Sequence, residues 1–88
     1  MNVEWTPAAL DDLANFYVAL SLAEQDDISR TVLRVNAELS LYPETLGESR
    51  EENCRVWCVG RLAVRYLMLP AVGIVTVYNA TLLRGSHR

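Results

Sequence analysis

The chain has 88 residues, of which 51% are hydrophobic and 22% charged, so we expect one globular domain over 1–88 and exclude a disordered chain. Eight arginines, no lysine and eleven acidic residues give a net charge of −3, which excludes a generally basic nucleic-acid binder; any RNA contact must come from a local arginine cluster. The sequence contains neither a long apolar run nor a signal-peptide pattern at its start, so we expect a cytoplasmic protein with no membrane contact.

The first predicted elements are a short strand and a helix. Residues 1–5 alternate between apolar and polar side chains, which favours a strand. Thr6 followed by Pro7 is typical of a helix start, because a threonine side chain caps the first turn and proline lacks an N–H that the first turn would leave unpaired. Apolar residues at helical spacing then predict a helix over 7–20.

A second helix follows almost at once. Ser21 and Glu24 have the spacing of a capping box, which predicts a new helix start. The apolar stripe continues over 22–42, and Pro43 ends it. Two helices joined by so short a connection form an antiparallel hairpin, and its apolar faces need a third surface to cover them.

The period of the sequence changes to two in its second half. A polar, acidic loop is expected over 44–53, followed by strands over 54–59, 62–69 and 74–83. The predicted fold is therefore α+β, with a short N-terminal strand and a two-helix hairpin packed on one face of a small, twisted antiparallel β-sheet.

The cysteines give little reason to expect a metal or a disulfide. Cys54 and Cys58 lie about 13 Å apart if both are on one strand, which is too far for a disulfide. A metal site needs more ligands, and His87 is the sole histidine. We expect two inert, buried thiols, no metal and no cofactor.

Pleat alternation predicts where the arginines lie. If the two cysteines face the helices, then Arg55 and Trp57 point to the opposite, uncovered face of the sheet. Arg61 and Arg65 are expected on that same face, and Arg84 follows the last strand. Such a surface suits RNA, because guanidinium binds phosphate and indole stacks on a base. It suits an acidic peptide equally well. The remaining alternative is that these arginines are only solvated and bind no partner.

Several short motifs, spread over nearly the whole chain, follow one known pattern: the opening VEWTPAALDDL, a Pro43…Gly47 loop, Arg55-Val56, Arg65-Tyr66, and Arg84 after a valine-rich strand. In these motifs the chain resembles the RelE/ParE superfamily, the toxins of bacterial type II toxin–antitoxin systems, among them plasmid stabilisation proteins. The resemblance implies a toxin of that fold with a cognate antitoxin as its partner.

RelE-like members of the superfamily are metal-independent endoribonucleases that cut mRNA on the ribosome by attack of a ribose 2′-hydroxyl on phosphate. For this activity the resemblance implies a catalytic set of Arg65, Arg84 and His87, and RNA contacts from Arg55, Trp57 and Arg61. Two departures count against it. Ala63 replaces the usual arginine of the middle strand, and the lysines of ribonuclease members have no counterpart.

We expect mRNA cleavage in the first place, because Arg55, Arg65, Arg84 and His87 can converge at one end of the uncovered sheet face and supply phosphate cations and a proton carrier. Two other functions stay open from the sequence. ParE-like members inhibit DNA gyrase and need no catalytic set, while an inactive toxin-fold protein would only bind its antitoxin or another partner. Whether the chain is an enzyme therefore stays undecided. Some relatives use a loop glutamate as a base, and four residues compete for that role: Glu44, Glu48, Glu51 and Glu52.

Overall fold

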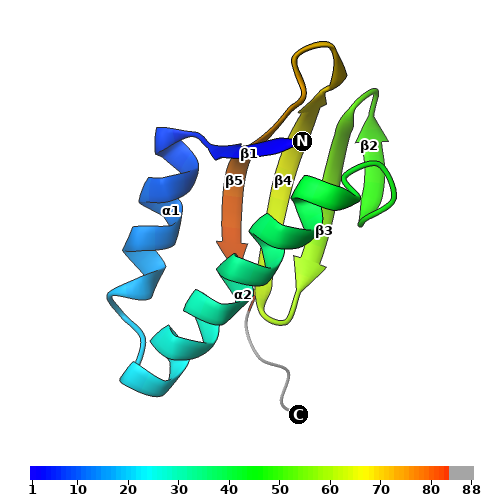
Figure 1. Cartoon of the computed structure of the whole chain (residues 1–88). Helices are drawn as coiled ribbons and strands as arrows, with labels where there is room; N and C mark the ends of the chain where they lie inside the picture. Colours follow the sequence, from blue (N-terminus) through cyan, green and yellow to red (C-terminus); the bar gives the residue numbers. More distant parts are fainter. Residues whose placement is uncertain (84–88) are drawn as a thin grey trace.

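The structure, a computed structural model that describes residues 1–83, has two helices on one face of a five-stranded sheet (Figure 1). The elements in chain order are β1 (Asn2–Trp5), α1 (Pro7–Tyr17), α2 (Leu22–Leu41), β2 (Glu48–Glu51), β3 (Cys54–Val59), β4 (Leu62–Leu69) and β5 (Ile74–Leu82). In space the strands run in the order β1-β5-β4-β3-β2. The predicted α+β class, with a helical hairpin on one sheet face, is confirmed.

The sheet is mixed, although the sequence predicted an antiparallel one. β1 lies parallel to β5, with Asn2 opposite Ile74 and Trp5 opposite Val77, while the other three pairings are antiparallel. The connection from β1 to β5 runs through both helices and three strands, and a connection of this length permits a parallel pair, whereas a tight turn does not. The sequence also missed β2, which forms within the expected loop.

Both helix starts are capped as the sequence predicted. The Thr6 hydroxyl accepts a hydrogen bond from the Ala9 amide at 3.1 Å. The Ser21 hydroxyl accepts from the Glu24 amide at 3.2 Å, and the Glu24 carboxylate accepts from the Ser21 amide at 3.0 Å. Each bond satisfies a backbone donor that the first helical turn leaves unpaired. The helices end slightly earlier than predicted, at Tyr17 and Leu41.

The core lies between the helices and one face of the sheet. Its fully buried side chains come from α2 and from alternate positions of β4 and β5: Val35, Leu39, Leu62, Val64, Tyr66, Val75 and Val77. α1 contributes Ala9, which is completely buried, while Leu10 is 50% exposed. A small residue therefore allows α1 to approach the sheet closely. Within residues 1–83, neither helix has the length and hydropathy needed to cross a membrane.

Candidate functional site

The register of β3 on β4 decides which arginines share a face. Residues directly opposite each other in a sheet point to the same side. Arg55 lies opposite Tyr66, and Trp57 lies opposite Val64. Because Tyr66 and Val64 are fully buried beneath the helices, Arg55 and Trp57 point to the helix side as well. The prediction that they lie on the uncovered face was wrong.

The reason lies at the end of β3, where a buried valine fixes the alternation. Val59 is buried and lies opposite Leu62, so the residues two and four positions before it share its face. Cysteine is small enough for either face, so the two cysteines did not indicate this register. The expectation that both are buried was wrong, because Cys54 is only partly buried and Cys58 is exposed. The uncovered face, called the open sheet face from here on, includes Cys54, Val56, Cys58, Ala63, Arg65, Leu67, Thr76, Asn79 and Thr81.

The Arg55 side chain donates hydrogen bonds to the loop between α2 and β2. Its Nε donates to the Leu46 carbonyl at 2.6 Å, and a terminal nitrogen donates to the Gly47 carbonyl at 3.1 Å. The Tyr66 hydroxyl reaches the same loop, at 2.6 Å from the Pro43 carbonyl and 2.9 Å from that of Leu46. We call Arg55 and Tyr66 the loop clamp. Burial raises the pKa of Tyr66 above its usual value, so this phenol stays a neutral donor at physiological pH.

Arg61 also has structural partners. It lies in the turn between β3 and β4, where its side chain donates to a Glu24 carboxylate oxygen at 3.2 Å and to the Leu83 carbonyl at 3.2 Å. The pKa of Glu24 is lowered, first by the hydrogen bonds from Ser21 and then by Arg61. Arg61 thus connects the turn to α2 and to the end of β5, and it does not lie beside Arg65 as predicted.

Arg65 is the one predicted site residue that the structure places on the open sheet face. It is exposed, lies between Val56 on β3 and Asn79 on β5, and has no ion pair or side-chain hydrogen bond within residues 1–83. Arg84 and His87 lie outside the described residues. The predicted cluster of arginines around an exposed indole is therefore not assembled in the described chain.

Carboxylates border the open sheet face at its two edges. On β2, Glu48 lies opposite Val56 and Glu51 lies opposite Cys54, so two of the four loop glutamates share this face. On β1, Glu4 lies opposite Thr76. Residues 1–83 contain no group of three or more histidine, cysteine or acidic side chains that could hold a metal ion. The open sheet face thus offers one central guanidinium, half-buried apolar neighbours and an acidic border.

Sequence reasoning also missed a contact at the free edge of β5. β1 pairs with β5 only as far as Val77. Beyond that point the Asp12 carboxylate of α1 accepts from the Ala80 amide at 3.3 Å and from the Asn79 side chain at 3.4 Å. Asp12 therefore satisfies an edge amide that no strand covers. The sequence did not indicate this contact, because the position of Asp12 early in α1 gives no sign of the distant strand.

Comparison with known proteins finds solved structures that share this architecture. No family profile matches the sequence, and neither does any curated protein. Among solved structures, a chain from the chromosomal ParDE toxin–antitoxin system of P. aeruginosa aligns with a TM-score of 0.72 at 13% identity, covering 96% of this chain and 97% of that one. The isolated E. coli RelE toxin aligns with a TM-score of 0.61 at 12% identity, covering 97% and 86%.

These alignments span both proteins almost completely, so they compare whole domains. At 12–13% identity they establish the fold and leave the activity open. The chain has the RelE/ParE fold, as the motifs of the sequence predicted.

Proposed function

We propose that this protein is the toxin of a type II toxin–antitoxin pair and that it acts by binding a protein target, with DNA gyrase as the first candidate. The observation that carries the proposal is the exposed Arg65 at the centre of the open sheet face: of the other arginines predicted to lie beside it within residues 1–83, Arg55 and Arg61 are engaged elsewhere. The similarity in fold to a ParDE chain and to RelE supports the toxin assignment.

The chemistry of the open sheet face suits a protein better than an RNA strand. An RNA backbone carries one negative charge per nucleotide, and its binding sites track it with several cations and stacking aromatics. Here one guanidinium stands among Val56, Leu67 and small side chains, and the edges carry carboxylates. A protein partner that presents one acidic side chain among apolar ones matches this pattern.

The same features support a cognate antitoxin as a partner. An antitoxin segment that places a carboxylate on Arg65 and apolar side chains over its neighbours would cover the open sheet face. Such a complex would form in the cytoplasm, where we expect both proteins to be made.

Ribosome-dependent mRNA cleavage is the second candidate. It is favoured by the exposure of Arg65, whose guanidinium has no carboxylate partner within residues 1–83 and is free for a phosphate. In this alternative Arg65 and Arg84 would stabilise the charge that develops on the phosphate, and His87 would supply a proton. Loss of both activities would leave the inactive partner-binding protein.

Induction of the protein alone in bacteria separates these functions. We expect growth arrest with a DNA-damage response and no ribosome-dependent mRNA fragments, and we expect the purified protein to inhibit gyrase supercoiling. Arg65→Ala should weaken both effects at least about tenfold, because it removes a desolvated charge contact. The matched control Arg30→Ala removes an exposed arginine on α2, away from the open sheet face, and should leave them unchanged.

Two results would contradict the proposal. Fragmented mRNA without a DNA-damage response would favour the endoribonuclease, and relief by Arg84→Ala or His87→Gln would then confirm its catalytic set. Unimpaired growth with retained antitoxin binding would favour the inactive protein.

A further inference from the structure

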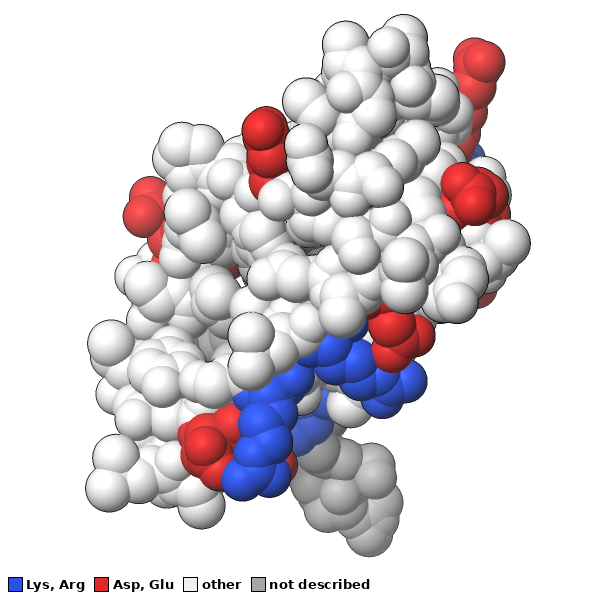
Figure 2. Space-filling view, in the orientation of Figure 1, with Lys and Arg blue, Asp and Glu red and all other residues white. Residues whose placement is uncertain are grey.

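Arg65 differs from the other arginines of the described chain because its side chain has no partner there. In Figure 2, which shows the side of the molecule that carries the helices, the arginine side chains lie beside acidic ones. Within residues 1–83 four arginines pair with carboxylates, as Arg30–Asp26, Arg34–Glu38, Arg50–Glu48 and Arg61–Glu24. Arg55 donates to backbone carbonyls. Arg65 is exposed and makes no such contact with residues 1–83, so its guanidinium is available to a ligand.

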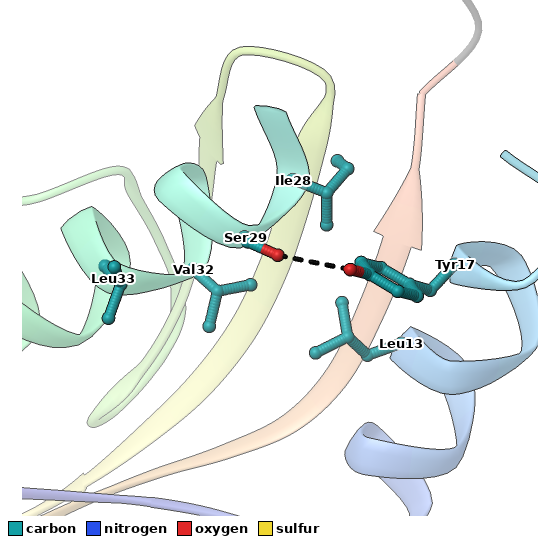
Figure 3. A pocket seen from close by; sticks show the side chains of 6 residues that line it. All are labelled: Leu13, Tyr17, Ile28, Ser29, Val32 and Leu33. Atoms are coloured by element: carbon teal, nitrogen blue, oxygen red, sulfur yellow. Dashed lines mark hydrogen bonds between the residues drawn. The ribbon is translucent and has the colours of Figure 1, made fainter. Parts of the chain in front are cut away.

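The groove between α1 and α2 is unsuited to an acidic ligand. It is lined by six uncharged residues, shown in Figure 3: Leu13, Tyr17, Ile28, Ser29, Val32 and Leu33. Its two side-chain hydroxyls, those of Tyr17 and Ser29, lie 3.4 Å apart and share a hydrogen bond. A carboxylate in this groove would lose hydration without meeting a cation. The open sheet face is therefore the better place for an acidic ligand.

A β-bulge in β5 lies directly opposite Arg65. Tyr66 lies opposite Val77 and Arg65 lies opposite Asn79, so Tyr78 is an extra residue of β5 at this point. A bulge of this kind sets two residues of one strand against one residue of its neighbour. Tyr78 and Asn79 therefore both face Arg65.

The burial pattern shows to which side the bulged residues point. Val77 is completely buried and Ala80 is only 5% exposed, so both lie on the helix side of the sheet. Regular alternation would place a single residue between two such positions, whereas β5 has two. Tyr78, which is 38% exposed, and the half-buried Asn79 therefore point to the open sheet face. An aromatic residue does lie beside an arginine on that face, but it is Tyr78 and not the predicted Trp57.

The Tyr78 hydroxyl is available to a ligand, whereas the Asn79 side chain has partners. Asn79 donates to the Asp12 carboxylate at 3.4 Å, and its side-chain oxygen accepts from the Thr81 hydroxyl at 3.4 Å. The Tyr78 hydroxyl has no hydrogen bond within residues 1–83. β1 pairs with β5 only as far as Val77, so β1 does not extend beside Tyr78. The bulge thus brings a phenol without a partner opposite a guanidinium without a partner.

The two donors together match a carboxylate. A guanidinium binds a carboxylate through parallel N–H groups, and a phenol O–H is a further donor that the same oxygens can accept. Residues at facing positions of a sheet have Cβ atoms about 5 Å apart, so arginine and tyrosine side chains can reach one ligand. Val56 and Leu67, half-buried on the same face, offer apolar contacts to the residues that flank such a carboxylate.

We propose that Tyr78 is a second binding residue of the open sheet face and donates a hydrogen bond to the same acidic side chain of the protein partner that Arg65 binds. This inference rests on the proposed function, because it specifies the partner chemistry of the surface through which the protein binds its target.

Titration of the purified protein with the peptide acetyl-Leu-Glu-Leu-amide tests the pair without gyrase or an antitoxin. The amide NMR signals of Arg65 and Tyr78 report binding. We expect a millimolar dissociation constant for the wild type, and binding of the glutamine counterpart of the peptide at least about tenfold more weakly. Tyr78→Phe should raise the dissociation constant of the glutamate peptide about fivefold, because it removes one hydrogen bond to a charged group.

A double variant shows whether the two residues bind one group. Arg65→Ala should weaken binding of the glutamate peptide at least about tenfold. Adding Tyr78→Phe to Arg65→Ala should have little further effect, since both donors bind the same carboxylate. Tyr42→Phe is the matched control, because Tyr42 is 55% exposed at the end of α2, on the helix side, and this variant should bind like the wild type.

The proposal is overturned if Tyr78→Phe binds the glutamate peptide like the wild type, if the glutamine peptide binds equally well, or if the wild type shows no binding up to about 50 mM. Tighter binding of dimethyl phosphate, which carries the charge of one RNA backbone unit, would overturn it in favour of the second candidate function. If the peptide behaves as expected but gyrase is not inhibited, the gyrase proposal fails and the Arg65–Tyr78 pair stands. If the wild type and Tyr78→Phe inhibit gyrase equally and bind the peptide equally, this inference alone fails.

Discussion

Loss of the Tyr66 hydroxyl tests whether the loop clamp holds the loop between α2 and β2. In Tyr66→Phe the ring stays in its fully buried position, and only the hydroxyl that contacts the loop is lost. The Leu46 carbonyl keeps its hydrogen bond from Arg55 at 2.6 Å. Within residues 1–83 the buried Pro43 has no other donor for its carbonyl.

The expected loss follows from that single unsatisfied acceptor. A buried carbonyl deprived of its partner costs about 1–3 kcal/mol, and the remaining Arg55 contacts limit the movement of the loop. We therefore expect the free energy of unfolding to fall by about 1–2 kcal/mol. For a domain of this size the melting temperature should fall by about 4–16 °C.

Urea unfolding measured by circular dichroism gives this free energy directly. Tyr78→Phe is the control, because Tyr78 is 38% exposed and its hydroxyl has no hydrogen bond within residues 1–83. Its unfolding free energy should stay within about 0.5 kcal/mol of the wild type. If Tyr66→Phe is equally harmless, the hydroxyl does not hold the loop and the role assigned to the clamp is wrong.

Two further predictions concern the same region. Gly47 has a φ of +65°, and an added Cβ would lie 2.1 Å from the Val56 carbonyl oxygen, so Gly47→Ala should lower the unfolding free energy in urea by at least about 2 kcal/mol. Gly60→Ala, at a φ of +58° but with nothing within 4 Å, should cost only about 1 kcal/mol; equal losses would contradict the predicted clash. Because burial raises the pKa of Tyr66 above 10.0, its contribution to stability is complete below about pH 10 and is lost as the pH rises through the folded-state pKa. Unfolding free energies measured from pH 8 upward should therefore decline more steeply above about pH 10 in the wild type and in Tyr78→Phe than in Tyr66→Phe. Parallel curves would show that burial does not raise the pKa of the Tyr66 phenol.

The helices and the inner strands were predictable because local signals determine them. Thr6 and Ser21 cap helices through neighbours three residues away, and the alternation of β4 fixes its buried side without ambiguity. β2 could not be predicted in this way. Its four residues are all exposed, so no apolar period marks it, and it forms because Gly47 permits the chain to turn against β3.

The site was less predictable than the fold because it depends on the register of one strand. In β3 both alternating sets contain apolar residues, since Val56 lies in one and Trp57 in the other. The choice between them is made by Val59, which is buried at the turn. An arginine beside a tryptophan suggested a binding surface, whereas here Arg55 binds backbone carbonyls of its own chain.

The parallel pairing of β1 with β5 has a consequence for the order in which the protein can fold during synthesis. Asn2 lies opposite Ile74, so about 70 residues must be made before the first strand meets its neighbour. At about 5–20 residues per second, β1 emerges several seconds before β5 does. β5 lies between β1 and β4, so β1 cannot join the sheet without it. Until then the nascent chain on the ribosome has an incomplete core. The open sheet face includes β5, so it forms only when translation of the domain is nearly finished.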